Sequence, residues 1–235
     1  MKRPLAVRVG VIALALALPV HARAAQAPAH PAPTALALER LENRYALLLA
    51  QHRPDLAERY GATPYSVKFV PIDEATAGAH VLELRQLLTE AEPLPAGSRA
   101  DSLRDRLRRE IADSGPGGAL HRDALVWLDV IDAAARAPFS VGTGNGCDRT
   151  RRGALQLRTL PEALRGATVL MRGAAAPDPA AFEARLARLE QLFRTDLPAR
   201  TEPCKEGRRR AEFVEADSLA AASLAQFRHW LSSGE

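Results

Sequence analysis

The chain of 235 residues is poor in aromatic residues and in cysteine. Phenylalanine, tryptophan and tyrosine together supply 5% of the sequence, and two residues are cysteine. The apolar content comes mainly from alanine and leucine, which favour helices, whereas the aromatic side chains common in strands are scarce. The composition therefore argues against a β-rich fold and predicts an all-α protein.

The sequence also lacks an apolar run long enough for a transmembrane helix, which needs about 20 residues. Its most apolar stretch, residues 9–20, is shorter than this. It follows a basic segment and precedes Ala22-Arg23-Ala24, where small residues stand at the spacing of a cleavage site. We therefore expect residues 1–24 to be a signal peptide that is removed on export. The mature protein would then have no membrane span and would be periplasmic or secreted.

Two further boundaries follow from the expected cleavage. Residues 25–33 are rich in alanine and proline, a composition that predicts a flexible leader. The length of the remaining segment, residues 34–235, suits one domain or a two-lobed helical array. We expect a single all-helical domain.

The mature chain would carry no excess of positive charge. The whole sequence has 32 Lys and Arg against 28 Asp and Glu, but Lys2, Arg3, Arg8 and Arg23 leave with the signal peptide, so 28 of each sign remain. The basic run at residues 208–210 has no aromatic companions and is interpreted as a solvated helix face. Nucleic-acid or anionic-membrane binding needs a retained, clustered basic surface, so we expect neither.

Several motifs of catalytic and cofactor sites are absent. The chain contains neither the His-Glu-x-x-His helix of zinc peptidases nor a Gly-x-Ser-x-Gly nucleophile turn. Gly142, Gly144 and Gly146 are spaced by two, but the segment lacks the preceding strand and the Gly-Lys-Ser/Thr ending of a phosphate-binding loop. We therefore predict no metal ion and no other cofactor, and we favour binding over catalysis.

The spacing of apolar residues predicts a bundle or array of about seven helices. The first covers residues 34–52, and a short second one runs from Pro54 to a stop at Gly61. Further helices are expected at about 73–92, 98–114, 119–137, 160–171, 178–193 and 208–231. Residues 138–148 are interpreted as an irregular loop, and Pro198 and Pro203 as a break.

Polar residues indicate where several of these helices begin and which helix face is exposed to solvent. Asp73 and Asp178 are expected to cap their helices, and Thr159 with Glu162 has the spacing of a capping box. In the helix at 98–114, Leu103, Leu107 and Ile111 are assigned to the inner face. The charged residues of that helix, Arg104 and Glu110 among them, are assigned to solvent.

Cys147 and Cys204 lie in predicted loops. In an exported chain two such thiols most simply form a disulfide, because the compartment is oxidising. Closing about 58 residues would stabilise the fold by roughly 4 kcal/mol in the chain-entropy model. A nucleophilic Cys147 is the alternative, but no histidine stands near it in the sequence.

The candidates for a polar site are weak. His80 and Glu83 share a helix face, and His121 lies close to Asp123, but a zinc site needs three or four convergent ligands and neither pair supplies them. We therefore interpret both pairs as solvated helix residues. If a polar site exists, we expect it to be assembled from His52, His80, Glu83 and His121.

Two segments of the chain resemble a known family. The run RPDLAERYG at 53–61, with Tyr65 and then LRQLL at 84–88, is similar to the start of the exported bacterial proteins grouped as the domain of unknown function 885 family. LRTLPEAL at 157–164 is similar to that family's Arg-Leu-x-x-Ile-Pro-x-x-Leu segment. Longer members resemble zinc peptidases and carry His-Glu-x-x-Pro-Gly-His-His in a C-terminal half that has no counterpart here. The resemblance therefore implies an isolated N-terminal helical lobe, and no metal ligand carries over.

Two classes of function are consistent with these observations. The first is an exported, non-catalytic helical module that binds a partner protein, a peptide or a small ligand in a groove between helices. The second is a peptide-directed hydrolase related to zinc peptidases, whose site is incomplete or is completed by another chain. The absence of the metal-binding motif favours the first.

Overall fold

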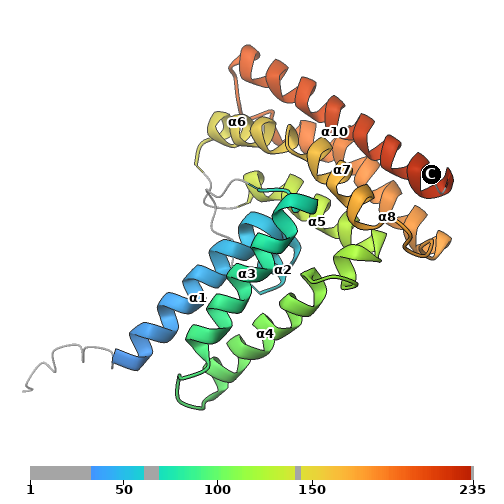
Figure 1. Ribbon diagram of the computed structural model, residues 1–235. Coiled ribbons are helices and arrows are strands. Elements are labelled where there is room, and N and C mark those ends of the chain that lie inside the picture. Colours follow the sequence, from blue (N-terminus) through green and yellow to red (C-terminus); the bar gives the residue numbers. More distant parts are fainter. Residues whose placement is uncertain (1–32, 61–68, 141–143, 234–235) are drawn as a thin grey trace, which may run out of the picture. The chain divides into compact units, whose positions relative to one another are not determined.

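Every regular element that the structure describes is a helix. The computed structural model describes residues 33–60, 69–140 and 144–233 (Figure 1), and within these ranges it contains no strand. The predicted all-α class is therefore confirmed. The expected signal peptide, nearly all of the expected leader and the helix stop at Gly61 lie outside the described residues. None of the described helices is long and apolar enough to cross a membrane.

The first four helices surround an apolar core of their own. They are α1 (Pro33–His52), α2 (Pro54–Arg59), α3 (Glu74–Ala91) and α4 (Ser98–Ser114). α3 packs along α4, and α1 contacts both α2 and α3. The buried apolar members of this core are Leu41, Tyr45, Leu48, Leu49, Ala50, Leu56, Ala57, Leu84, Leu87, Ala91, Leu103 and Leu107.

The later helices build a second core. In chain order they are η1 (Ala119–His121), α5 (Ala124–Arg136), η2 (Ala137–Phe139), α6 (Gly146–Leu157), α7 (Leu160–Leu170), α8 (Pro179–Gln191), the π-helical η3 (Leu192–Asp196), α9 (Leu197–Arg200) and α10 (Gly207–Ser233). α10 runs along α6 and α7, and α5 packs against α8 (Figure 1). This core is rich in aromatic rings, which are those of Phe69, Trp127, Phe182, Phe193, Phe213 and Phe227.

The two cores belong to one compact unit and are joined by contacts between their helices. α2 contacts α5, and α3 contacts α7. Phe69 and Ile72, which precede α3, are buried in the second core, and the Phe69 N–H donates to the Gln156 side chain at 3.1 Å. α7 passes this segment so closely that a Cβ at Gly166 would lie 2.9 Å from the Ile72 carbonyl oxygen. Only a glycine fits at that crossing.

Two of the predicted helix starts are confirmed and one is wrong. The Asp73 carboxylate accepts from the Thr76 N–H at 2.8 Å, and the Asp178 carboxylate accepts from the Ala181 N–H at 2.7 Å. Each therefore satisfies an amide in the first turn. Thr159 does not form a capping box, because its hydroxyl donates backwards to the Gln156 carbonyl at 2.7 Å.

Three predicted boundaries are corrected. The expected loop at 138–148 contains the short η2 and gives way to α6, which starts at Gly146 because the Asn145 side chain accepts from the Asp148 N–H at 2.9 Å. The expected helix at 119–137 is broken, since the Asp123 carboxylate accepts from the Leu125 N–H at 2.8 Å and opens α5 afresh. Pro198 does not end a helix but lies in the first turn of α9.

Arg104 is buried, not solvated as its helix pattern suggested. Its residue is 8% exposed, and one guanidinium nitrogen donates to the carbonyl oxygens of Ala91 at 2.9 Å and Leu94 at 3.1 Å. These carbonyls lie at the end of α3 and in the turn after it, and the Ala91 carbonyl also accepts from the Leu94 N–H at 3.2 Å. Arg104 therefore closes the end of α3 from the neighbouring helix, which explains why a charged side chain is buried there.

Candidate functional site

The structure brings together two of the four candidate polar residues. His52 is the last residue of α1 and His80 lies in the second turn of α3, and their ring centroids are 4.7 Å apart. His80 is 2% exposed, so its interpretation as a solvated residue is wrong. Glu83 lies on the exposed face of α3 and stays solvated, and His121 ends η1, where it lines a separate cavity.

Glu110, which the helix pattern assigned to solvent, is the centre of the buried cluster. The residue is 1% exposed. Its carboxylate accepts from the Arg53 guanidinium at 3.1 and 3.2 Å and from the Ser114 hydroxyl at 2.8 Å. The His80 Nε2 atom lies 3.6 Å from the same carboxylate. Because a buried carboxylate is stable only when paired, these contacts account for its position in the core.

Arg53 joins Glu110 to a second carboxylate. It lies between α1 and α2, where the following Pro54 starts the new helix and keeps Arg53 out of the helical conformation. Its guanidinium donates to both Asp55 oxygens, from Nε at 3.0 Å and from Nη2 at 2.9 Å. Burial lowers the pKa of Arg53, but Glu110 and Asp55 outweigh it, so the pKa lies above its ordinary value and the group stays charged.

The two histidines of the cluster differ in their hydrogen bonding. The His52 Nδ1 atom lies 2.9 Å from the Val70 carbonyl oxygen and must carry the proton, since a carbonyl only accepts. Burial, and then His80, lower the pKa of His52 to about 4, so the ring is neutral at pH 7. Neither ring nitrogen of His80 has a hydrogen-bond partner among the described residues. A buried imidazole in that state is uncommon.

Tyr45 borders the cluster on the side of α1. The residue is 4% exposed, and its hydroxyl has no hydrogen-bond partner among the described residues. Burial, followed by the charge of Glu110, raises the pKa of this phenol above its ordinary value, so the hydroxyl keeps its proton. It is thus a buried donor with nothing to donate to.

A cavity adjoins the cluster on the side of Ser114, and we name it the histidine cavity. It has a volume of about 500 Å³ and lies between α3, the end of α4, η1 and α7. Its lining combines apolar residues with a serine, a histidine and an arginine: Ala77, Gly78, Val81, Arg85, Ser114, Pro116, His121, Val169 and Leu170. Ser114 therefore belongs both to the cavity wall and to the cluster.

A second cavity adjoins the cluster on the side of Tyr45, and we name it the tyrosine cavity. It has a volume of about 480 Å³ and is lined by residues of α1 and α4 and by Tyr60, which follows α2. Its lining is more polar than that of the histidine cavity and consists of Glu42, Asn43, Tyr45, Ala46, Leu49, Tyr60, Ser98, Arg99, Ser102, Leu103 and Arg106. The buried cluster thus has a cavity on each of two sides.

The cluster has the wrong order of groups for a serine hydrolase. In such an enzyme a histidine stands between the serine and the carboxylate and takes the serine proton. Here the Ser114 hydroxyl donates directly to the Glu110 Oε1 atom, and the His80 Nε2 atom approaches that same oxygen, so the histidine does not stand between the serine and the carboxylate. Among the residues that the structure describes, no three His, Cys, Asp or Glu side chains are arranged to hold a metal ion. The contacts of Ser114 and Arg53 hold the Glu110 carboxylate in place.

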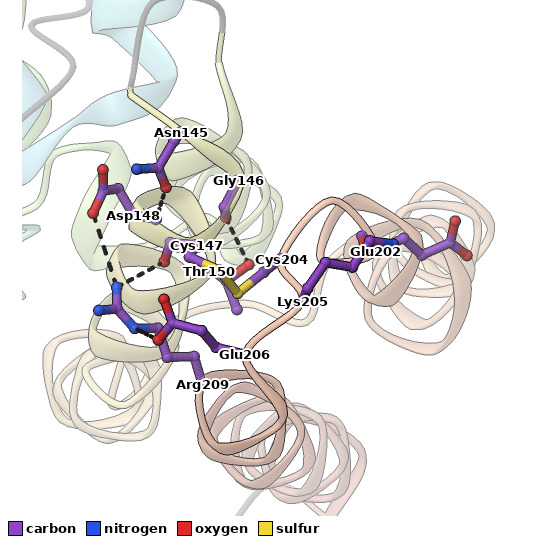
Figure 2. The surroundings of a disulfide bond; sticks show 10 residues. All are labelled: Asn145, Gly146, Cys147, Asp148, Thr150, Glu202, Cys204, Lys205, Glu206 and Arg209. Carbon is purple, nitrogen blue, oxygen red and sulfur yellow. Dashed lines mark hydrogen bonds and ion pairs between the residues drawn. A yellow bond between two sulfur atoms is a disulfide. The ribbon is translucent and has the colours of Figure 1, made fainter.

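The two cysteines form a disulfide far along the chain from the cluster. Cys147 lies in the first turn of α6 and not in a loop as expected, and Cys204 lies before α10. The Cα atoms of the two cysteines are 4.4 Å apart. Figure 2 shows Arg209 reaching from α10 toward the Cys147 carbonyl, Asp148 and Glu206. The predicted pairing is therefore present in the structure. It fits an oxidising compartment and leaves Cys147 without a free thiol.

No family model, no characterised protein and no solved structure matches the chain. The case for a function therefore depends on the buried cluster and on the two cavities beside it.

Proposed function

We propose that the protein is an exported, non-catalytic helical module that binds a small ligand or a peptide side chain in the histidine cavity. The observation that supports this most is the cavity itself. Its volume of about 500 Å³ and its mostly apolar lining with a few polar groups are typical of ligand sites. The Ser114 side chain in its wall is fixed by a hydrogen bond to Glu110, which in turn is paired with Arg53. A wall fixed in advance reduces the entropy that binding costs.

The lining indicates what kind of ligand would fit. Arg85 forms no ion pair with any residue that the structure describes, and His121 makes no hydrogen bond with those residues. A ligand with an acidic group could satisfy both. Val81, Val169 and Leu170 would contact an apolar body. The expected ligand is therefore small, apolar over most of its surface and acidic at one end.

The same residues argue for binding in preference to hydrolysis. Glu110, the carboxylate that the cavity residue Ser114 contacts, already accepts three hydrogen bonds and is buried. His121 has no described carboxylate or carbonyl partner to fix its tautomer and orientation, which a catalytic base requires. A peptide-directed hydrolase stays the alternative, and turnover of a peptide would favour it.

Export and ancestry are part of the proposal. The basic segment, the apolar run and the small residues near Ala24 support cleavage of a signal peptide and a periplasmic or secreted location. The resemblance to the domain of unknown function 885 family supports a helical lobe similar to the N-terminal part of that family's members. Intact-mass measurement on protein from the periplasmic fraction tests cleavage, and a species that still begins at Met1 would contradict it.

Gly78 offers a direct test of the histidine cavity. It lines the cavity, and a Cβ added there would meet no atom within 4 Å. Gly78→Phe should therefore fill the cavity without a clash, and Gly78→Ala is the matched control. Both replace a helical glycine with a better helix former, so neither should lower stability.

The readout is binding of a panel of short alkyl and aryl carboxylic acids and N-acetylated dipeptides, followed by calorimetry and thermal unfolding. We expect a probe that binds the wild type and Gly78→Ala similarly and binds Gly78→Phe at least about tenfold more weakly, a difference of about 1.4 kcal/mol. Equal binding to all three proteins would place the ligand elsewhere. Cleavage of a dipeptide by the wild type would favour the hydrolase.

A further inference from the structure

Arg106 differs from the other arginines of α4. Each of the others donates a hydrogen bond to a protein oxygen, as do Arg99 to Glu42, Arg104 to Ala91, Arg108 to Glu92 and Arg109 to Asp105. Arg106 is half-buried and donates to none of the residues that the structure describes. It is also the arginine that lines the tyrosine cavity without a carboxylate partner there.

The contact that Arg106 does make leaves its hydrogen-bond donors available. Its guanidinium carbon lies over the Tyr60 ring, 4.4 Å from the ring centroid. Such a cation–π contact uses the flat face of the guanidinium. The N–H groups point outward in the plane of the guanidinium, in the fork that matches a carboxylate. Tyr60 therefore holds the Arg106 side chain in place and leaves its N–H donors without hydrogen-bond acceptors.

Tyr45 supplies a second unsatisfied donor in the same cavity wall. Tyr45 lines the tyrosine cavity, and its buried hydroxyl has no partner among the described residues. The charge of Arg106 acts to lower the pKa of this hydroxyl, but burial outweighs it and the hydroxyl keeps its proton. A buried donor without an acceptor is costly, so an acceptor arriving in the cavity would remove that cost.

The other charges of the cavity are already balanced. Glu42 is paired with Arg99, and Glu110, which lies behind Tyr45, is paired with Arg53. The remaining lining is neutral, with the amide of Asn43 and two serine hydroxyls. The cavity therefore keeps one uncompensated charge, and it is positive.

We propose that the tyrosine cavity binds an organic carboxylate. Arg106 pairs with the carboxylate, the Tyr45 hydroxyl donates to it, and Leu49 and Leu103 contact its apolar body. A free carboxylic acid and the C-terminus of a short peptide present the same group, and the experiment separates them. This site shares no lining residue with the histidine cavity. A negative result at one cavity therefore does not affect the proposal for the other.

The experiment is a calorimetric or NMR titration of the mature protein with matched probes. 3-Phenylpropionate is compared with its uncharged amide, and N-acetyl-alanyl-phenylalanine is compared with the same dipeptide amidated at its C-terminus. We expect each acid to bind at least about tenfold more tightly than its amide, because the amide cannot form the ion pair. The acid that binds better of the two identifies the source of the carboxylate.

Substitutions assign the effect to the named residues. Arg106→Gln should weaken acid binding at least about tenfold, and Tyr45→Phe by a few-fold. Arg109→Gln is the matched control, since Arg109 lies on the same helix, is exposed and does not line the cavity, and it should bind like the wild type. Arg106→Lys keeps the positive charge but loses the paired N–H donors of the guanidinium. Its affinity for the acid should lie between those of the wild type and Arg106→Gln.

Three outcomes would overturn the site. They are equal binding of acid and amide, unchanged binding by Arg106→Gln, and no measurable binding of any acid to the wild type at millimolar concentration. Circular dichroism of each variant checks that the helices are intact. If Arg106→Gln does not fold, the comparison of Arg106→Lys with Arg109→Gln decides the question.

Discussion

The N-terminal helices α1–α4 and the later helices η1–α10 bury different kinds of polar side chain. The buried arginine, histidine and carboxylate side chains that the structure describes are in the first group: Arg53, His80, Arg104 and Glu110. In the second group the buried polar residues are neutral: Thr150, Gln156 and Thr201. The second group also contains the disulfide and most of the buried aromatic rings.

This difference shows where each group of helices is vulnerable. A neutral buried group needs about one hydrogen bond, whereas a buried charge is tolerated only while its partner stays in place. The N-terminal helices therefore depend on a few side-chain pairs. The later helices depend on packing and on a covalent link, and both proposed ligand cavities border the part that depends on pairs.

The largest expected effect concerns the covalent link. The double substitution Cys147→Ala and Cys204→Ala removes a bond between residues 57 apart. In the chain-entropy model this should lower the free energy of unfolding by about 4 kcal/mol. Urea unfolding of the two proteins measures the difference. An unchanged free energy would mean that the later helices do not depend on the disulfide.

The next effect concerns the charge pair. Glu110→Gln leaves Arg53 buried with only Asp55 as a carboxylate partner, and it should lower the free energy of unfolding by about 3 kcal/mol. Glu92→Gln is the control, because the exposed Glu92–Arg108 pair should contribute at most about 0.5 kcal/mol. If the two variants lose the same stability, the buried pair has no special role.

Acidification should destabilise the N-terminal helices through His52. Its pKa is about 4 when folded and 6.5 ordinarily, so between these values the unfolded chain takes up a proton that the folded chain does not. Its contribution to stability is present above pH 6.5 and is lost as the pH falls toward 4. Allowing for partial solvent exposure, we expect a loss of about 1–2 kcal/mol.

His52→Asn tests this, because the asparagine amide can still donate to the Val70 carbonyl but does not titrate. Its stability should change less between pH 7 and pH 4 than that of the wild type. His229→Gln, which alters an exposed histidine of α10, is the control and should leave the pH dependence unchanged. Identical pH profiles for the wild type and His52→Asn would rule out this role for His52.

The smallest effect has the opposite pH dependence and arises in α10. Burial raises the pKa of Asp217 to about 7, and its Oδ1 atom has no described hydrogen-bond partner. The protonated acid thus contributes stability below pH 3.8 that is lost as the pH rises through 7. Because the side chain is only half-buried, Asp217→Asn should stabilise the protein at pH 8 by about 1 kcal/mol. The gain should vanish near pH 4, and denaturant titrations at the two pH values measure it.

Apolar spacing and side-chain caps made much of the fold predictable. Phe182, Leu186, Leu189 and Phe193 follow one another in the sequence at intervals of four, three and four, which is the spacing of one helix face, and all are buried. α6 was missed because its buried positions include small or polar residues, so it lacks a clear apolar stripe. Its Gly153 is required by packing, since a Cβ there would lie 2.6 Å from the Phe139 ring. Such a constraint is visible only in three dimensions.

The buried cluster was only partly predictable. Glu110 and Ser114 follow Leu103 and Leu107 at helical spacing, so their positions on the inner face could have been read from the pattern. A charged residue in such a stripe is normally assigned to solvent, because its burial requires a partner. That partner, Arg53, is 57 residues away in the sequence. Only the packing of α4 against the turn between α1 and α2 brings the two together.

Hydrogen exchange measured at each residue tests most directly whether α1–α4 depend on buried side-chain pairs while the later helices depend on packing and the disulfide. It compares the wild type, Glu110→Gln and the double cysteine variant under native conditions. We predict that Glu110→Gln accelerates exchange mainly in α1–α4 and that the cysteine variant accelerates it mainly in α6 and α10. The same pattern of acceleration in both variants would contradict the account, because it would mean that one cooperative core, and not two differently stabilised groups of helices, supports the cavities.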